Sequence, residues 1–269
     1  MSRIGFIGGG NMAEALIKAV LFAELYKAEE IIVSDIVKER LSYLEDVYAV
    51  QAGASNAAVA GGVDILILSI KPQQMEEALE SIKDSVKEDT LVISIAAGVK
   101  TGKIASVLGD KAIIRVMPNT PALISEGAAA LYATEKAKSR LEEAKKIFDS
   151  AGKAVVVEDE GLMDTVTAVS GSGPAYFFLL IEEMIKSGVE LGLSEEMCRE
   201  LVLQTAKGAS MLACEGEKRG EGPGELRRKV TSPGGTTEAA LKVFSDGSFG
   251  ALVLSAVKRA YERSRELSG

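Results

Sequence analysis

The sequence contains no histidine and no tryptophan, and only two cysteines among its 269 residues. Without an imidazole the chain has no histidine general base, no Ser-His-Asp triad and no histidine metal ligand, so enzyme classes that depend on these groups are excluded. Cys198 and Cys214 form neither a disulfide scaffold nor a paired zinc motif, and their apolar neighbours favour buried, reduced thiols. We therefore expect no metal site.

An excess of basic residues is also missing, since 31 Lys and Arg stand against 39 Asp and Glu for a net charge of −8. This charge argues against a nucleic-acid-binding protein. The stretch most like a membrane span, residues 165–181, is interrupted by the polar and turn-forming residues 170–174. No signal peptide precedes the first predicted strand, which Arg3 opens. We expect a cytoplasmic protein that binds neither nucleic acid nor membrane.

Apolar runs rich in Ile, Val and Leu alternate with amphipathic segments through the first 160 residues, which is typical of a parallel sheet with crossover helices. The predicted strands occupy residues 3–7, 30–34, 65–69, 90–95, 112–117, 127–132 and 154–157. The predicted helices between them occupy residues 11–25, 38–46, 73–81, 100–108 and 135–150. The pattern predicts an α/β, Rossmann-like, doubly wound domain.

The strand pattern stops near Glu160, and only helical segments follow. They are predicted at residues 161–169, 174–191, 195–215, 236–244 and 249–267, with a loop at 216–224. Pro174 fits the first turn of its helix, where the missing N–H costs nothing. We therefore predict a dinucleotide-binding domain at residues 1–160 and an all-α domain at residues 161–269.

A glycine-rich turn links the first predicted strand to the first predicted helix. It has the pattern G-x-G-x-x-A and contains Gly8, Gly9, Gly10, Asn11, Met12 and Ala13. The glycines permit a tight turn and close approach of the backbone to a pyrophosphate, and the following helix presents free N–H groups. This turn predicts a dinucleotide site.

The end of the second predicted strand carries mixed signals for the coenzyme. Ser34, with Lys38 and Arg40 after it, suits the 2′-phosphate of NADPH, whereas Asp35 suits the ribose hydroxyl of NADH. The sequence favours NADPH and leaves NADH open. Lys71 and the segment at residues 96–98 follow two further strands, where open α/β sheets bind ligands.

The helical half contains two motifs rich in small residues, at residues 170–175 and 230–238. In the second motif, Gly235 is predicted as the N-cap of a helix with Glu238 at its third position, which leaves free N–H groups that a carboxylate would bind without any Arg. The hydroxyls of Thr236 and Thr237 lie beside them. From this motif alone, simple capping of the helix is the other interpretation. The segment at residues 176–181 is apolar on every side, which predicts burial between two chains.

Six segments together resemble the pyrroline-5-carboxylate reductase family, in order and over essentially the whole chain. They are Gly5-Phe6-Ile7-Gly8 to Met12, Lys71-Pro72, Ala96-Ala97-Gly98-Val99, Met117-Pro118-Asn119-Thr120-Pro121, Ser170-Gly171-Ser172-Gly173-Pro174-Ala175-Tyr176 and Ser232-Pro233-Gly234-Gly235-Thr236-Thr237. The resemblance implies reduction of 1-pyrroline-5-carboxylate to L-proline with NAD(P)H, the last step of proline biosynthesis. It also implies a helical domain that interleaves with its partner in a homodimer, with further assembly into a homodecamer.

The resemblance also implies roles for individual residues. Those implied to line the cofactor are Gly8, Gly9, Gly10, Asn11, Met12, Ser34, Asn56, Ile70, Lys71 and Ala97. Those implied to meet the substrate are Glu160, Ser232, Gly234, Gly235, Thr236 and Thr237. The Thr237 hydroxyl is placed near the ring nitrogen as the catalytic group. A protonated cyclic imine is already an electrophile, so the reaction suits a chain without histidine.

Two other functions share the predicted plan. A β-hydroxyacid or 6-phosphogluconate-type dehydrogenase would use a helical Lys as acid and base, and Lys186 is the candidate. A non-catalytic NAD(P)-binding protein would keep the fold without turnover, although the complete loop at residues 232–237 speaks against it.

Overall fold

The computed structural model describes residues 2–268, which fall into two compact units. The first unit contains the chain up to Pro174 together with the residues from Arg259 on, and the second is Ala175–Lys258. The strands end before residue 160, as the sequence predicts, but helical residues 161–174 belong to the same compact unit as the sheet.

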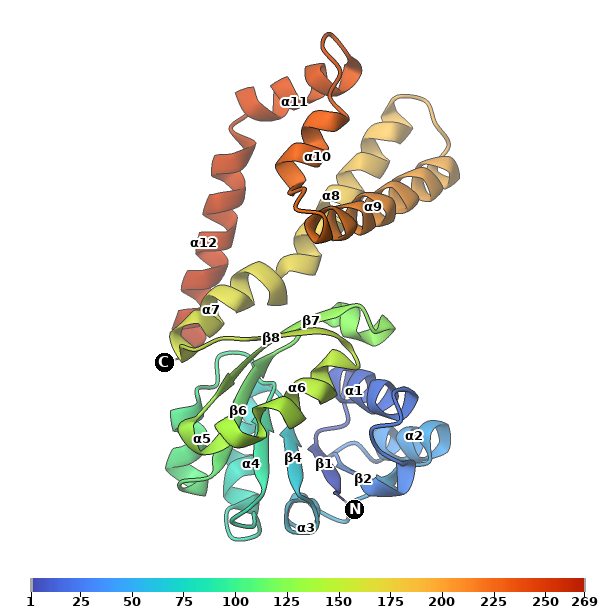
Figure 1. The fold of residues 1–269 in the computed structure, drawn as a ribbon. Helices are drawn as coiled ribbons and strands as arrows, with labels where there is room; N and C mark the ends of the chain where they lie inside the picture. The colour runs from blue at the N-terminus through green and yellow to red at the C-terminus, as the bar shows by residue number, and fades with distance from the viewer. Residues whose placement is uncertain (1, 269) are drawn as a thin grey trace. The chain divides into compact units, whose positions relative to one another are not determined.

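The first unit is built on one sheet of eight strands in the order β3-β2-β1-β4-β5-β6-β7-β8 (Figure 1). The strands are β1 (Ile4–Ile7), β2 (Ile31–Ser34), β3 (Gln51–Ala52), β4 (Ile65–Leu68), β5 (Leu91–Ser94), β6 (Ala112–Met117), β7 (Gly127–Ala133) and β8 (Gly152–Val156). In the centre of the sheet, Ile4 of β1 pairs with Ile31 on one side and with Ile65 on the other. Strands β2 and β3 lie on one side of β1, and β4 and the strands after it lie on the other, so the strand order reverses at β1. Open α/β sheets bind ligands at such a reversal.

The sheet departs from the predicted parallel arrangement at one place, because β7 runs antiparallel to β6. Only residues 118–126 connect these strands, and their one helical segment is the short 3₁₀ turn Thr120–Ile124. A parallel crossover needs about a dozen residues or more, so the chain turns back instead. Strand β3, which the sequence analysis missed, has two exposed residues and no apolar pattern.

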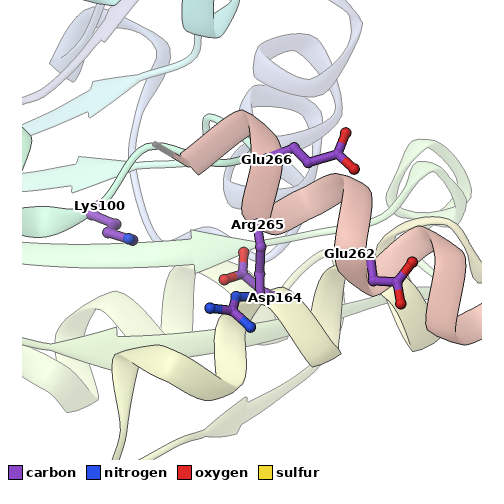
Figure 2. A pocket seen from close by; sticks show the side chains of 5 residues that line it. All are labelled: Lys100, Asp164, Glu262, Arg265 and Glu266. Carbon is purple, nitrogen blue, oxygen red and sulfur yellow. The ribbon is translucent and has the colours of Figure 1, made fainter.

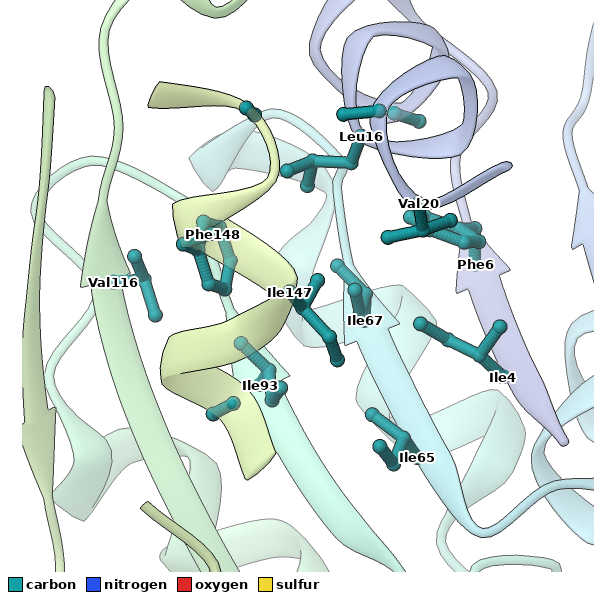
Figure 3. Packing of buried hydrophobic residues seen from close by; sticks show 14 of the residues in the cluster. Ile4, Phe6, Leu16, Val20, Ile65, Ile67, Ile93, Val116, Ile147 and Phe148 are labelled. Atoms are coloured by element: carbon teal, nitrogen blue, oxygen red, sulfur yellow. The ribbon is translucent and has the colours of Figure 1, made fainter. Parts of the chain in front are cut away.

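Helices cover both faces of the sheet, as predicted for strands without alternation. The helices of this unit include α1 (Asn11–Phe22), α2 (Lys38–Tyr48), α3 (Asn56–Gly62), α4 (Met75–Ile82), α5 (Thr101–Leu108) and α6 (Leu141–Asp149). Figure 3 shows one face, where Ile4, Phe6 and Ile67 pack against side chains of α1 and α6. The opposite face, with Ile7, Leu66 and Leu68, packs against α3, α4 and α5. The doubly wound prediction is confirmed.

Several boundaries differ from the predicted ones. Helix α3 is absent from the predicted helices, because its sequence Asn-Ala-Ala-Val-Ala-Gly-Gly has little helical periodicity. Helices α4 and α6 begin late, after the 3₁₀ turns Pro72–Gln74 and Glu135–Arg140. The loop expected at 216–224 is shorter, since helix α9 continues to Lys218 and α10 begins at Pro223.

The remaining helices follow β8. They are α7 (Met163–Val166), α8 (Gly173–Glu190), α9 (Glu195–Lys218), α10 (Pro223–Lys229), α11 (Thr236–Asp246) and α12 (Phe249–Ser268). A π-helical turn, Thr167–Gly171, connects α7 to α8, and Pro174 is the second residue of α8, in its first turn as predicted. Helix α12 supplies its first ten residues to the second unit and the rest to the first.

The second unit exposes many large apolar side chains. Phe177, Phe178 and Leu179 of α8 are 65%, 62% and 57% exposed in the single chain. Of the two free cysteines of α9, Cys198 is buried as expected, whereas Cys214, also expected to be buried, is exposed in the single chain. Within residues 2–268 no single helix is both long and apolar enough to cross a membrane. The bent pair formed by α11 and Phe249–Leu267 reaches that length and composition only when the two helices are taken together.

Candidate active site

The turn after β1 is fixed between the ends of two neighbouring strands. Gly8 donates its N–H to the carbonyl of Ser34 at 2.8 Å, and the Ser69 hydroxyl donates to the carbonyl of Gly8 at 2.7 Å. Gly8 has a φ of +95°, and a Cβ there would lie 2.6 Å from the carbonyl oxygen of Ser69. Only glycine fits this position, both by conformation and by space.

The next residue, Gly9, contacts two charged side chains. Its N–H donates to Oδ2 of Asp35 at 2.6 Å, and its carbonyl accepts a hydrogen bond from Nε of Arg40. Asp35 accepts a second backbone N–H, that of Val37, at 2.8 Å through Oδ1. Arg40 also forms an ion pair with Glu14 of α1.

Helix α1 presents its N-terminus at the end of this turn. Its N-cap is Gly10, which makes no side-chain capping bond, and a Cβ at Gly10 would meet no atom within 4 Å. Asn11 is exposed and Met12 half-buried. Free N–H groups and the positive end of the helix dipole together favour phosphate groups at this position.

Two adjoining cavities open beside the turn, with volumes of about 390 and 510 Å³. The first brings together five of the predicted cofactor residues, which are Gly8, Ser34, Asn56, Ile70 and Lys71. The second adds Lys38 to Ser34 and Asn56. The size and the position at the carboxyl ends of β1, β2 and β4 fit a nucleotide.

Ser34 and Asn56 form a polar pair in these cavities. The buried Ser34 hydroxyl donates to Oδ1 of Asn56 at 2.8 Å, and Asn56 is the first residue of α3. Gln74, Glu77 and Ser81 also line the first cavity, and the sequence analysis missed them. They lie on α4 or just before it and belong to no recognisable sequence motif. The one available signal is that their spacing places them on one side of the helix that follows Lys71.

Ala97 lies apart from the residues that line either cavity, in the half-buried loop after β5. The loop is supported by the end of α12, because Gly98, with a φ of +74°, would place a Cβ 3.3 Å from the carbonyl oxygen of Leu267. The loop that holds Ala97 thus lies close to the last turn of α12.

Glu160 is engaged within the first unit. Its carboxylate accepts from the Thr101 N–H at 2.7 Å and from the Thr101 hydroxyl at 2.8 Å, at the start of α5. It also lies 3.4 Å from Nη1 of Arg115, whose side chain is 3% exposed. Asp164, 3.8 Å from Nη2 of Arg115, accepts a hydrogen bond from Ser264 of α12 at 2.7 Å. These contacts connect β6, α5, α7 and α12.

Two of the sequence motifs pack on each other as scaffold. Asn119 donates to the carbonyl of Ser170 at 3.2 Å and accepts the N–H of Ala128 at 2.8 Å. Gly171 packs closely on Met117, since a Cβ there would lie 2.4 Å from Cε of Met117 and would push the end of that side chain aside. The motifs at residues 117–121 and 170–175 thus hold β7 and the π-helical turn in place.

The loop at residues 232–237 lies in the second unit and leads into α11. Gly235 is the N-cap and Glu238 the third helical residue, as predicted. Glu238 accepts the N–H of Gly234 at 2.7 Å, and Gly234 has a φ of +70°. Ser232 and Thr236 are exposed and Thr237 is half-buried. A carboxylate therefore already binds one N–H group of this loop.

A further cavity of about 480 Å³ lies at the end of α12 and is lined by Lys100, Asp164, Glu262, Arg265 and Glu266 (Figure 2). Its acidic groups have partners, because Glu266 lies 2.8 Å from Arg259 and 2.7 Å from Arg263. We assign no ligand to it. Among residues 2–268 no group of His, Cys, Asp and Glu side chains is arranged for a metal ion.

Lys186, the candidate acid and base of the alternative dehydrogenase, is exposed on α8. It pairs with Glu182 at 2.7 Å and with Glu183 at 2.8 Å. The hydrogen bonds to these two carboxylates raise the pKa of Lys186 above its ordinary value. A lysine held in its charged form is poorly suited to accept a proton, so the alternative is not favoured.

Comparison with known proteins gives one consistent family. A family model described as pyrroline-5-carboxylate reductase dimerisation matches residues 160–267, and one described as NADP oxidoreductase, coenzyme F420-dependent, matches residues 3–98. The chain is 43% identical to a pyrroline-5-carboxylate reductase of Pseudomonas aeruginosa, over 99% of this chain and 97% of that one.

Two solved structures extend this similarity to the fold. A pyrroline-5-carboxylate reductase from Coxiella burnetii has a TM-score of 0.93 at 37% identity, over 100% of this chain and 99% of that one. The pyrroline carboxylate reductase of Plasmodium falciparum, solved with NADP bound, has a TM-score of 0.88 at 32% identity, over 100% and 98% of the two chains.

Proposed function

This chain belongs to the pyrroline-5-carboxylate reductase family, and we propose from that membership the roles of its residues in the reaction. It is an oxidoreductase that reduces 1-pyrroline-5-carboxylate to L-proline with a nicotinamide cofactor, in proline biosynthesis. Its homo-oligomeric state follows from the dimerisation region at residues 160–267.

We propose that the cavities beside the β1–α1 turn hold the dinucleotide. The turn is formed by Gly8, Gly9 and Gly10. The first helical residues, Asn11 and Met12, would face the phosphates. The rest of the dinucleotide would lie along Ile70, Lys71 and Ala97. The fit rests on the open space beside Gly10 and on the N-terminus of α1, which has no side-chain cap. When bound, the reduced nicotinamide supplies a hydride.

We propose NADPH as the preferred coenzyme, with NADH as the weaker alternative. The observation that carries this is the Ser34–Asn56 pair at 2.8 Å, which places neutral polar groups at the end of β2, with Lys38 on the adjoining cavity. Asp35, the residue that would favour NADH, already accepts two backbone N–H groups. Neutral donors beside a cation suit a 2′-phosphate better than a ribose hydroxyl.

The test is an absorbance assay of reduced-nicotinamide oxidation with 1-pyrroline-5-carboxylate, run separately with NADPH and NADH. We expect the higher kcat/KM with NADPH. The variant Ser34→Asp places a carboxylate at the 2′ position and should lower kcat/KM far more for NADPH than for NADH. Equal or better efficiency of the unmodified enzyme with NADH would refute the preference.

We propose that Ser232, Gly234, Gly235, Thr236 and Thr237 bind the substrate. The N–H groups at the start of α11 would hold its carboxylate, because a helix N-terminus favours an anion. The N–H of Gly234 is engaged by Glu238. The Thr237 hydroxyl would accept a hydrogen bond from the protonated ring nitrogen and orient the imine. For Glu160, the contacts with Thr101 and Arg115 favour positioning of α5, and direct contact with substrate stays a prediction.

We further propose that residues 1–160 act as the dinucleotide-binding domain and residues 161–269 as the substrate-binding and dimerisation domain, assembled in the cytoplasm as homodimers that join into a decamer. The family matches at residues 3–98 and 160–267 support the division. Light scattering distinguishes the two assemblies, because their masses are two and ten times the 28.3 kDa of the chain.

A further inference from the structure

We infer that Asp35 and Arg40 are positioning residues that hold Gly9 of the dinucleotide turn, Asp35 through the peptide before it and Arg40 through the peptide after it. From sequence both residues read as candidates for direct contact with the coenzyme. The structure instead directs both toward the backbone of the turn. The inference rests on the proposed dinucleotide site and concerns how that site is kept in shape.

Asp35 links the turn to the segment that follows β2. One carboxylate oxygen accepts the Gly9 N–H at 2.6 Å and the other accepts the Val37 N–H at 2.8 Å. A charge-assisted hydrogen bond of this kind is roughly twice as strong as a neutral one. Asp35 therefore fixes the direction of the Gly8–Gly9 peptide, and the N–H of that peptide is committed to the carboxylate.

Arg40 holds the same residue from its carbonyl side. Its Nε donates to the Gly9 carbonyl while its Nη2 pairs with Glu14, so the guanidinium connects α2 to the turn and to α1. The guanidinium carbon also lies 4.9 Å from the centre of the Tyr43 ring. The two nitrogens of the fork are both engaged, a geometry that Lys is unable to reproduce.

Glu14 is itself fixed by two phenols. Tyr43 and Tyr48 of α2 donate to its Oε1 at 3.0 and 2.9 Å. Burial and the hydrogen bond to Glu14 raise the pKa of Tyr48 to about 12, so this phenol stays a donor at neutral pH. The network thus runs from Asp35 through Gly9 and Arg40 to Glu14, with each contact supporting the next.

The functional consequence lies in the residues next to Gly9. Gly10 is the N-cap of α1, and the free N–H groups proposed to bind the pyrophosphate follow it directly. A rotation of the Gly9–Gly10 peptide, whose carbonyl Arg40 holds, would turn these groups away. Both coenzymes carry the same pyrophosphate, so loss of the network should weaken NADPH and NADH alike.

The experiment uses two substitutions that keep the charge. Arg40→Lys removes the fork, and Asp35→Glu moves the carboxylate by one methylene. The dissociation constants of NADPH and NADH are measured on the full-length protein by nicotinamide fluorescence, without imine, so that an error in the proposed substrate residues does not affect the result. We expect both constants to rise by about tenfold, with their ratio unchanged within about twofold.

Matched controls lie elsewhere in the same unit. Arg140→Lys removes a fork that binds Glu143 and two backbone carbonyls, and Asp149→Glu moves a carboxylate that accepts the Ala154 N–H. They should lower Tm by amounts similar to the test pair and leave both dissociation constants unchanged. Cofactor affinity therefore separates positioning from general stability.

Two results would overturn the inference. If Arg40→Lys weakens NADPH alone, or Asp35→Glu weakens NADH alone, the residue contacts the coenzyme directly. If neither constant changes, the network does not position the turn. A preference of the parent protein for NADH would refute the proposed coenzyme while leaving this inference intact.

Discussion

At the scale of single residues, the hydroxyl of Thr237 has the most specific role. Thr237→Val keeps the shape of the side chain and removes one hydrogen bond to a charged ring nitrogen, which is typically worth roughly 1.5–3 kcal/mol. We expect kcat/KM for the imine to fall roughly ten- to a hundredfold, with the dissociation constant of NADPH unchanged. Steady-state kinetics and a coenzyme titration measure the two effects.

The adjacent variant Thr236→Val provides the comparison, because it makes the same change one residue earlier in the same helix turn. Tm is measured for both, since lost packing in the first turn of α11 would also reduce activity. If the Thr237→Val protein is folded and reduces the imine at the parental rate, the catalytic role of the hydroxyl is wrong and Thr237 contributes only to the first turn of α11.

Residues with charged side chains near the turn show where sequence reasoning stops. Asp35 and Arg40 stand at the right distance along the chain for coenzyme contact, and that much is readable. Whether each side chain points to the ligand or to the Gly9 backbone depends on rotamers set by α1 and α2. The Ser34–Asn56 hydrogen bond is not readable from the sequence either, because 22 residues separate the partners and only the fold brings them together.

At the scale of elements, Glu160 joins the start of α5 to the buried Arg115 of β6. Glu160→Gln keeps the size of the side chain and removes the charge that balances Arg115. We expect the free energy of unfolding to fall by roughly 2 kcal/mol, and denaturant titration measures it.

The exposed Glu158 offers a neighbouring control, and Glu158→Gln should leave the unfolding free energy within about 0.5 kcal/mol of the parent. An unchanged stability of Glu160→Gln together with a raised KM for the imine would contradict the positioning role and place Glu160 at the substrate.

Elements with a strong apolar pattern were predictable, and those defined by distant contacts were not. Strands β1, β4 and β5 carry continuous apolar runs that read directly as buried strands. Strand β3 consists of two exposed residues that exist by pairing with β2, and α3 has almost no periodicity. The reversal of β7 follows from a short connection whose consequence is visible only in the sheet.

At the scale of the whole molecule, the exposed apolar face of α8 predicts the behaviour of the oligomer. Phe178→Asp introduces a charge that would be buried without a partner in an apolar interface, and this is strongly unfavourable. We expect the mass measured by light scattering to fall to that of one chain at micromolar concentration, together with a large loss of activity.

Phe22→Asp makes the same change at the end of α1, where Phe22 is 88% exposed, and should leave both mass and activity unchanged. A Phe178→Asp protein that stays oligomeric and fully active would show that this face of α8 does not lie between chains.

The division of α12 between the two units has a consequence for synthesis on the ribosome. The hydrogen bond from Ser264 to Asp164 spans 100 residues, and Leu267 supports Gly98 from near the end of the chain. The first unit is therefore complete only after the last turn of α12 has emerged, when the apolar helices of Ala175–Lys258 are already outside the ribosome. We therefore expect these helices to be exposed to water before the sheet unit closes, a stage at which nascent chains are prone to aggregate.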